Sequence, residues 1–286
     1  MSTGIVLHGI DWMARNADHE DLVHDSFELI ERASDYLDSS SQFTPGRNDF
    51  HYCSALIISK IQRFSRSIVV LLYDGNTEAA FVLLRAVYED IFQLGYMATD
   101  PEKLGSQCKA YSIIDSLVHL QYRRKIGGMT SDELRLQLDS VGGKYRAVID
   151  EFTNPTGARS ESTVDLLDRK FFDNWTKLGL GDVANRAGLR PYFDTTYKYC
   201  LSFVHGAKGL PQQYAVFSKE GQLEAIDPNR PPDDRDLQQV MLDLTLAQLL
   251  TFDILCDVYQ MDFPAEHAHV AERWRELVKK REDSAP

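Results

Sequence analysis

Residues 49–102 read DFHYCSALIISKIQRFSRSIVVLLYDGNTEAAFVLLRAVYEDIFQLGYMATDPE, and this stretch decides the fold class. Its apolar side chains recur every three or four residues, which places them on one face of a helix. Gly75 can adopt the left-handed conformation that ends a helix, and Asn76 can cap the next one. The acid, proline and acid at 100–102 are typical of a further helix start. The stretch predicts three successive helices, and their short connections favour antiparallel neighbours.

The same periodicity continues on both sides of this stretch, without the alternation of strands and helices that builds a doubly wound sheet. Residues 209–232 are rich in proline and glycine, and 214–217 and 222–226 could pair there as a small β-hairpin. Residues 153–163 are expected to be a flexible loop. Further helices are expected near 18–39, 131–152, 164–178, 182–188, 191–206, 233–260 and 265–281.

We therefore predict an all-α protein, an up-and-down helical bundle formed by one domain over 1–286. The core bundle is expected at about 18–150 and 191–281, with an irregular elaboration at about 153–190 and a loop or hairpin at about 209–232.

Charge and hydropathy exclude several classes of function. The 43 acidic residues outnumber the 31 basic ones, so the formal net charge is -12. A broad duplex nucleic-acid surface is therefore not expected, because each phosphate contact needs a Lys or Arg. The longest apolar run, 68–73, is far shorter than the ~20 residues of a membrane span. The start of the chain shows no signal peptide, and we expect a cytoplasmic protein with no membrane partner.

The metal-binding patterns that the sequence suggests are incomplete. His19 and His24 are five residues apart, whereas a zinc protease helix needs two His four apart. Glu266 with His269 supplies one Glu-x-x-His motif, whereas a di-iron bundle needs two. The four cysteines are isolated from one another in the sequence and are expected to be reduced core residues. We expect neither a metal nor a cofactor.

Two groups of polar residues remain as candidate sites. Arg85 and Glu89 are four residues apart on one helix face among apolar neighbours. They form either a buried structural pair that ties two helices together or part of a functional site. Ser202 and His205 are three residues apart near a helix end. His205 is either a residue that caps the helix end or a general acid/base. In the second case, Ser202 orients either the His205 ring or a substrate.

The order of these groups resembles a bacterial family known only as domain of unknown function 5677. Its hallmarks are an apolar segment, a glycine turn, Leu-Arg-x-x-x-Glu, an aromatic residue near an Asp-Pro-Glu helix start, and a later aromatic residue before Ser-x-x-His. In this chain the hallmarks are 71–75, 79–80, 84–89, Tyr96, 100–102, Tyr199, Ser202 and His205. The resemblance covers about 50–255 and implies an all-helical fold with no established activity.

The chain is also similar, more distantly, to the HEPN (higher eukaryote and prokaryote nucleotide-binding) superfamily. That resemblance implies a homodimer and, for many members, a metal-independent ribonuclease in toxin–antitoxin or anti-phage systems. The active motif of those proteins is an Arg and a following His with four to six residues between them. This chain departs from it, because Lys198 is the only cation at that distance before His205. Arg85 could substitute from another helix.

Three functional hypotheses follow. The first is a ligand- or partner-binding module of a bacterial defence or regulatory system, which binds a partner protein or a small phosphate-bearing ligand through Arg85, Lys198, Tyr96 and Tyr199. The second is a HEPN-like ribonuclease or nucleotide-processing toxin with His205, Ser202, Glu89 and Arg85 as catalytic residues. The third is that these motifs have a purely structural role.

Overall fold

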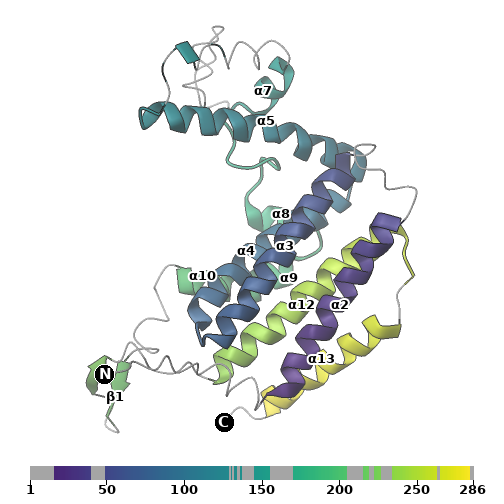
Figure 1. Cartoon of the computed structure of the whole chain (residues 1–286), viewed down its shortest axis with the longest axis vertical. Helices are drawn as coiled ribbons and strands as arrows, with labels where there is room; N and C mark the ends of the chain where they lie inside the picture. The colour runs from purple at the N-terminus through teal and green to yellow at the C-terminus, as the bar shows by residue number, and fades with distance from the viewer. Residues whose placement is uncertain are drawn as a thin grey trace.

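The computed structural model describes residues 16–39, 49–128, 130, 132–133, 136, 145–154, 170–204, 215–218, 222–226, 234–262 and 265–283. The fold is an all-α helical bundle, as predicted (Figure 1). The helices are α2 (Ala17–Ser39), α3 (Asp49–Tyr73), α4 (Thr77–Ala98), α5 (Pro101–Lys125), α7 (Arg146–Phe152), α8 (Leu180–Arg186), α9 (Arg190–Tyr192), the π-helical turn η2 (Phe193–Tyr197), α10 (Lys198–Val204), α12 (Asp234–Tyr259) and α13 (Ala265–Asp283).

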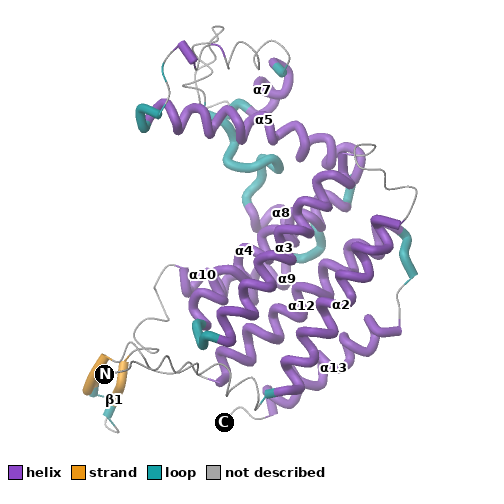
Figure 2. The backbone as a smooth tube through the Cα atoms, viewed as in Figure 1, coloured by secondary structure: helices purple, strands orange, loops and turns teal. Residues whose placement is uncertain are grey.

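The predicted hairpin is also present. Strands β1 (Ala215–Phe217) and β2 (Leu223–Ile226) pair antiparallel, with a register shift between Val216 and Phe217. Figure 2 shows this pair in orange, apart from the helices.

Helix α4 lies at the centre of the bundle. It packs against α3, α8, α10 and α12, while α2 covers α12 and α13 covers α2 (Figure 1). Its apolar side chains face neighbours on several sides because they occupy more than one stripe of the helix, which is typical of a helix buried in a core. The side chains of α4 that are fully buried are Ala80, Phe81, Leu84, Val87, Tyr88, Ile91, Phe92, Leu94 and Met97.

The predicted helix boundaries in the first half of the chain are confirmed. Gly75 has a φ of 73°, in the left-handed region that glycine tolerates, and ends α3. The side chain of Asn76 accepts a hydrogen bond from the Ala79 amide at 3.1 Å, and that of Asp100 accepts one from the Lys103 amide at 3.4 Å. Each cap satisfies an amide that the first turn of a helix leaves unpaired.

Helix α5 departs from the expected antiparallel arrangement. It crosses the end of the α3–α4 pair, and its C-terminal half extends away from the bundle with α7 packed on it (Figure 1). The crossing is held by Lys109, whose ammonium lies 2.6 Å from the carboxylate of Asp49 at the start of α3. A short connection keeps two successive helices close in space, but contacts such as the ion pair between Lys109 and Asp49 set the angle between packed helices.

The helix expected near 164–178 is absent from its described part, 170–178. Thr153 and Phe171 instead form an isolated antiparallel bridge, and Trp175 turns inward to stack on Tyr96. Farther upstream, Thr130 and Glu133 exchange the hydrogen bonds of a capping box, one residue before the helix start expected at 131. The expected loop at 155–163 and the expected helix over 137–144 lie outside the described residues, and the division into bundle and elaboration stays a prediction.

The helix expected over 191–206 is interrupted by a different helical form. α9 leads into the π-helical turn η2, and α10 follows without a gap. A π-helical turn contains more residues than an α-helical one and occurs often at functional sites. It therefore changes which side chains share a face. His205 and Gly206 lie outside the described residues.

Helix α12 is long and apolar enough to cross a membrane by length and composition alone. However, 78% of its apolar window is buried inside the bundle. This burial is typical of the core helix of a soluble protein, and it explains the apolar composition without a membrane.

Candidate functional site

Arg85 and Glu89 form an ion pair on α4, at the surface of the bundle. A guanidinium nitrogen of Arg85 lies 2.6 Å from a carboxylate oxygen of Glu89, and each side chain is 30% exposed. The spacing of four residues puts both on one helix face. The pair is therefore half-buried and reachable from solvent, rather than sealed between two helices.

Tyr197, the last residue of η2, completes this pair. Its hydroxyl accepts a hydrogen bond from Nε of Arg85 at 3.3 Å and donates one to Glu89 at 2.9 Å. The guanidinium carbon also lies 5.7 Å from the centre of the Tyr197 ring, within cation–π range. Burial raises the pKa of Tyr197 and the hydrogen bond to Tyr197 raises the pKa of Arg85, so both keep their protons at neutral pH.

A second aromatic ring extends this arrangement along the surface. Phe193 stacks on Tyr197 with ring centres 5.0 Å apart. Arg190 and Lys198 lie over Phe193, at 5.3 and 5.6 Å from its centre. Both also contact Asp194, at 2.6 and 2.7 Å. We call the group formed by Arg85, Glu89, Arg190, Phe193, Asp194, Tyr197 and Lys198 the cation–aromatic cluster.

The cluster has capacity to bind an anion. It contains three cations and two carboxylates, so it carries one net positive charge on a chain whose total is -12. An arginine has five N–H donors. Arg85 gives one to Tyr197 and one to Glu89, and no other hydrogen bond from it is found among the described residues. These two contacts hold the guanidinium in place while leaving donors for a ligand.

The other predicted site residues point elsewhere. Tyr96 stacks on Trp175 and lies about 16 Å from Arg85 along α4, eleven residues at 1.5 Å each. Tyr199 packs edge-on against Phe81 and donates to Asp236 at 3.2 Å. The structure thus brings Arg85 and Glu89 into direct contact and links Lys198 to them through the stacked rings of Phe193 and Tyr197, whereas Tyr96 and Tyr199 lie elsewhere.

Ser202 uses its hydroxyl inside its own helix. Its Oγ donates to the Tyr199 carbonyl oxygen at 2.6 Å. This local bond competes with donation to a substrate or to a neighbouring ring. The position of His205, the other half of this predicted pair, lies outside the described residues.

A buried polar centre lies behind the cluster. The Tyr88 hydroxyl donates to the backbone carbonyl of Asp243 in α12 at 3.1 Å. The Asp243 carboxylate accepts from Gln239 at 2.7 Å, and burial raises its pKa to about 7. Sequence reasoning missed Asp243, although an acid at a core position of an apolar helix is the signal that reveals it.

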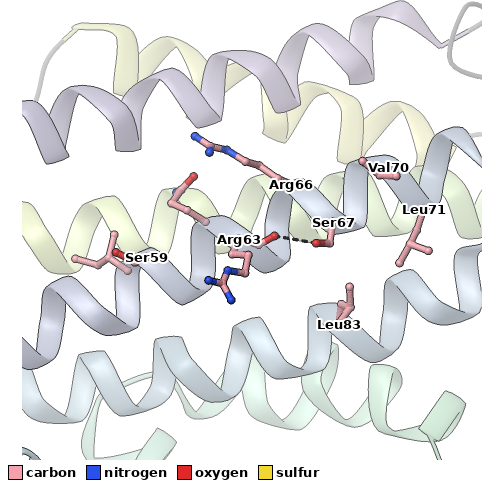
Figure 3. A pocket seen from close by; sticks show the side chains of 9 residues that line it. Ser59, Arg63, Arg66, Ser67, Val70, Leu71 and Leu83 are labelled. Carbon is pink, nitrogen blue, oxygen red and sulfur yellow. Dashed lines mark hydrogen bonds between the residues drawn. The ribbon is translucent and has the colours of Figure 1, made fainter.

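A groove of about 820 Å³ lies on the outer side of α3 (Figure 3). Arg63 and Arg66 project from α3 in different directions beside it, and Leu83 of α4 faces them from the next helix. Leu83 and Arg85 are two residues apart, so they lie on nearly opposite faces of α4. The groove and the cation–aromatic cluster are therefore separate features.

Within the described part of the chain, no three His, Cys, Asp or Glu side chains gather in a way that could hold a metal ion.

Comparison with known proteins assigns the family. The model of a family described as "Family of unknown function (DUF5677)" matches residues 51–222, more than half of the 286-residue chain. The chain belongs to this family, as its helical motifs predicted. No curated protein and no solved structure matches it. The matched range includes all of α3 except its first two residues, the whole of α4 and the whole cation–aromatic cluster.

Proposed function

We propose that this protein is a binding module, and that its cation–aromatic cluster recognises a small phosphate-bearing ligand. The observation that carries the proposal is the fixed guanidinium of Arg85, held between Glu89 and Tyr197 with donors to spare. Guanidinium groups bind phosphate oxygens with two parallel hydrogen bonds, and a prearranged group loses little freedom on binding.

The neighbouring residues favour the same kind of ligand. Arg190 and Lys198 add two cations within the same surface, and their side chains are 45% and 53% exposed. A nucleotide or another phosphate ester could therefore meet several cations at once. Phosphate should be attracted only at the cluster, because the rest of the chain is net negative. Salt also screens exposed charges that are more than about 10 Å apart.

The setting of this activity is also part of the proposal. We infer a cytoplasmic protein of a bacterial defence or regulatory system, such as anti-phage defence, which acts as a homodimer or with a partner protein. The family resemblance alone supports this setting. The HEPN-like ribonuclease stays an alternative, and the bond of Ser202 to its own helix supports binding over catalysis.

Ligand binding tests the proposal directly. The purified protein would be titrated with ATP, GTP, their monophosphates and inorganic phosphate by isothermal titration calorimetry. We expect at least one of these probes to bind, and Arg85→Gln to weaken its binding by roughly 10- to 100-fold, the value of a hydrogen bond between charged groups. Gln keeps much of the aliphatic part of the side chain but removes the charge.

Arg63→Gln is the matched control. Arg63 is exposed on α3, and no ion pair involving it is found among the described residues. Unchanged binding in this variant supports the cluster as the site. If Arg63→Gln abolishes binding and Arg85→Gln does not, the groove on α3 is the site and the proposal is wrong. RNA cleavage in EDTA by wild type, but not by His205→Ala, would establish the ribonuclease instead.

A further inference from the structure

Helices α3 and α5 cross at an unusually short distance. A Cβ atom on Gly105 would lie 2.6 Å from the backbone nitrogen and Cα of Phe50, closer than real Cβ contacts allow. Glycine at position 105 therefore lets the two backbones touch. The residues three positions farther along each helix, nearly one turn on, are Cys53 and Cys108.

The thiols of Cys53 and Cys108 lie next to each other at this crossing, because the Cys53 sulfur contacts the carbonyl oxygen of Gly105, nearly one turn before Cys108 in α5. The interaction between the two thiols lowers the pKa of Cys53 and raises that of Cys108. The Cys53 sulfur lies 3.8 Å from the carbonyl oxygen of Gly105, to which its S–H donates. The two sulfur atoms are thus neighbours in space although 55 residues separate them in the sequence.

Polar contacts hold the crossing in register around these thiols. The carboxylate of Asp49 accepts from Lys109 at 2.6 Å and from Ser106 at 3.1 Å. Cys108 is partly exposed, whereas Cys53 is buried behind it. A small oxidant can therefore reach the Cys108 thiol from solvent, and the Cys53 thiol lies close enough to react with Cys108 afterwards.

We propose that Cys53 and Cys108 form a reversible disulfide that fastens α5 to α3. The oxidant is a small disulfide, such as oxidised glutathione. Cys108 first gives its proton to the Cys53 thiolate, and the Cys108 sulfur then attacks the oxidant, which forms a mixed disulfide and releases one small thiolate. That small thiolate takes the proton back from Cys53. The Cys53 thiolate then attacks the Cys108 sulfur and releases the second small thiol. Two protein thiols are oxidised, and one small disulfide is reduced to two thiols.

The remaining cysteines of the described chain provide an internal contrast. Cys200 in α10 and Cys256 in α12 are both buried. Burial raises the pKa of each, and no neighbouring thiol lowers it, as Cys108 lowers that of Cys53. Oxidation should therefore select the pair at the α3–α5 crossing.

Mass spectrometry of the native protein tests this inference. The full chain would be incubated with oxidised glutathione, alkylated with iodoacetamide and digested with trypsin without reduction. Trypsin releases Cys53 within 48–60 and Cys108 within 104–109. We expect these peptides to be linked, two of the four thiols to be lost, and dithiothreitol to reverse both changes. The melting temperature of the oxidised form should rise by roughly 5 °C, because the link closes a long loop.

Three variants make the test specific. Cys53→Ser and Cys108→Ser should each abolish the linked peptide and the rise in melting temperature, whereas Cys200→Ser should keep both. If a variant fails to fold, the presence or absence of the linked peptide in the wild-type protein still tests the inference. Recovery of both peptides with free or glutathione-capped thiols would overturn the inference. A linked peptide that forms only in guanidinium chloride, or that joins Cys200 or Cys256, would overturn it as well.

Discussion

The hydroxyl of Tyr197 donates a hydrogen bond to Glu89 at 2.9 Å, across 108 residues of chain. The same oxygen accepts from Arg85. One phenol thus joins the π-helical turn η2 to the central helix α4 and sets the orientation of the guanidinium.

Tyr197→Phe should destabilise the protein by about 1–2 kcal/mol, because it removes two hydrogen bonds from a side chain that is only 6% exposed. The ring and its stacking on Phe193 remain. Urea unfolding measures the effect. Tyr199→Phe is the control, since Tyr199 is 43% exposed and its hydroxyl bonds only to Asp236 among the described residues. An equal loss in both variants would show that Tyr197 contributes only as a buried aromatic ring.

Glu89→Gln should change stability and anion binding in opposite directions. The variant loses a partly exposed ion pair, so the free energy of unfolding should fall by about 0.5–1 kcal/mol. Arg85 then carries an uncompensated charge, and phosphate affinity should rise by roughly two- to fivefold. Calorimetric titration alongside Arg85→Gln measures this. A loss of affinity as large as that of Arg85→Gln would mean that the carboxylate is needed mainly to hold the guanidinium in place.

Asp243 should make stability depend on pH. Burial raises its pKa to about 7, opposed by Gln239 and Arg281, whereas an unfolded chain loses this proton near pH 4. The folded chain therefore holds one more proton between about pH 4 and pH 7, and its stability falls as the pH rises through that range. Asp243→Asn removes the titration and keeps an oxygen for Gln239.

We expect Asp243→Asn to match wild type near pH 4.5 and to exceed it at pH 8 by roughly 2–4 kcal/mol, measured by urea unfolding at both values. Asp257→Asn, the same change of acid to amide at an exposed position of the same helix, is the control. If the difference between Asp243→Asn and wild type is the same at both values, Asp243 keeps an ordinary pKa in the folded protein.

The part of the site that lies within one helix was predictable, and the part that depends on packing was not. The spacing of Arg85 and Glu89 places them together in any α-helix. Tyr197 joins them only because η2 packs on α4, and its π-helical turn shifts the face that a regular helix over 191–206 would present. The spacing of four between Arg190, Asp194 and Lys198 is visible in the sequence, but the stacked ring of Phe193 beneath them is a result of folding.

The same distinction explains the cysteines. Their separation in the sequence predicts four isolated thiols, and nothing in the helical periodicity indicates that α5 crosses α3 at Cys53. Only the close approach at Gly105 brings Cys108 beside it. A glycine inside a helix costs about 1 kcal/mol relative to alanine, so Gly105 was a signal of close packing that the sequence analysis did not use. The partner helix was not predictable.

Gly105→Ala should test this crossing directly. A methyl group there would meet the backbone of Phe50 at 2.6 Å, and neither backbone can move as a side chain would. We expect a loss of about 1–3 kcal/mol, the usual result of overpacking, despite the higher helix propensity of alanine. Gly128→Ala is the control, since its nearest neighbour would lie at 3.5 Å. Chemical unfolding of both variants gives the comparison. If Gly105→Ala is as stable as wild type, α5 does not cross α3 at this distance, and the thiols of Cys53 and Cys108 should then fail to link on oxidation.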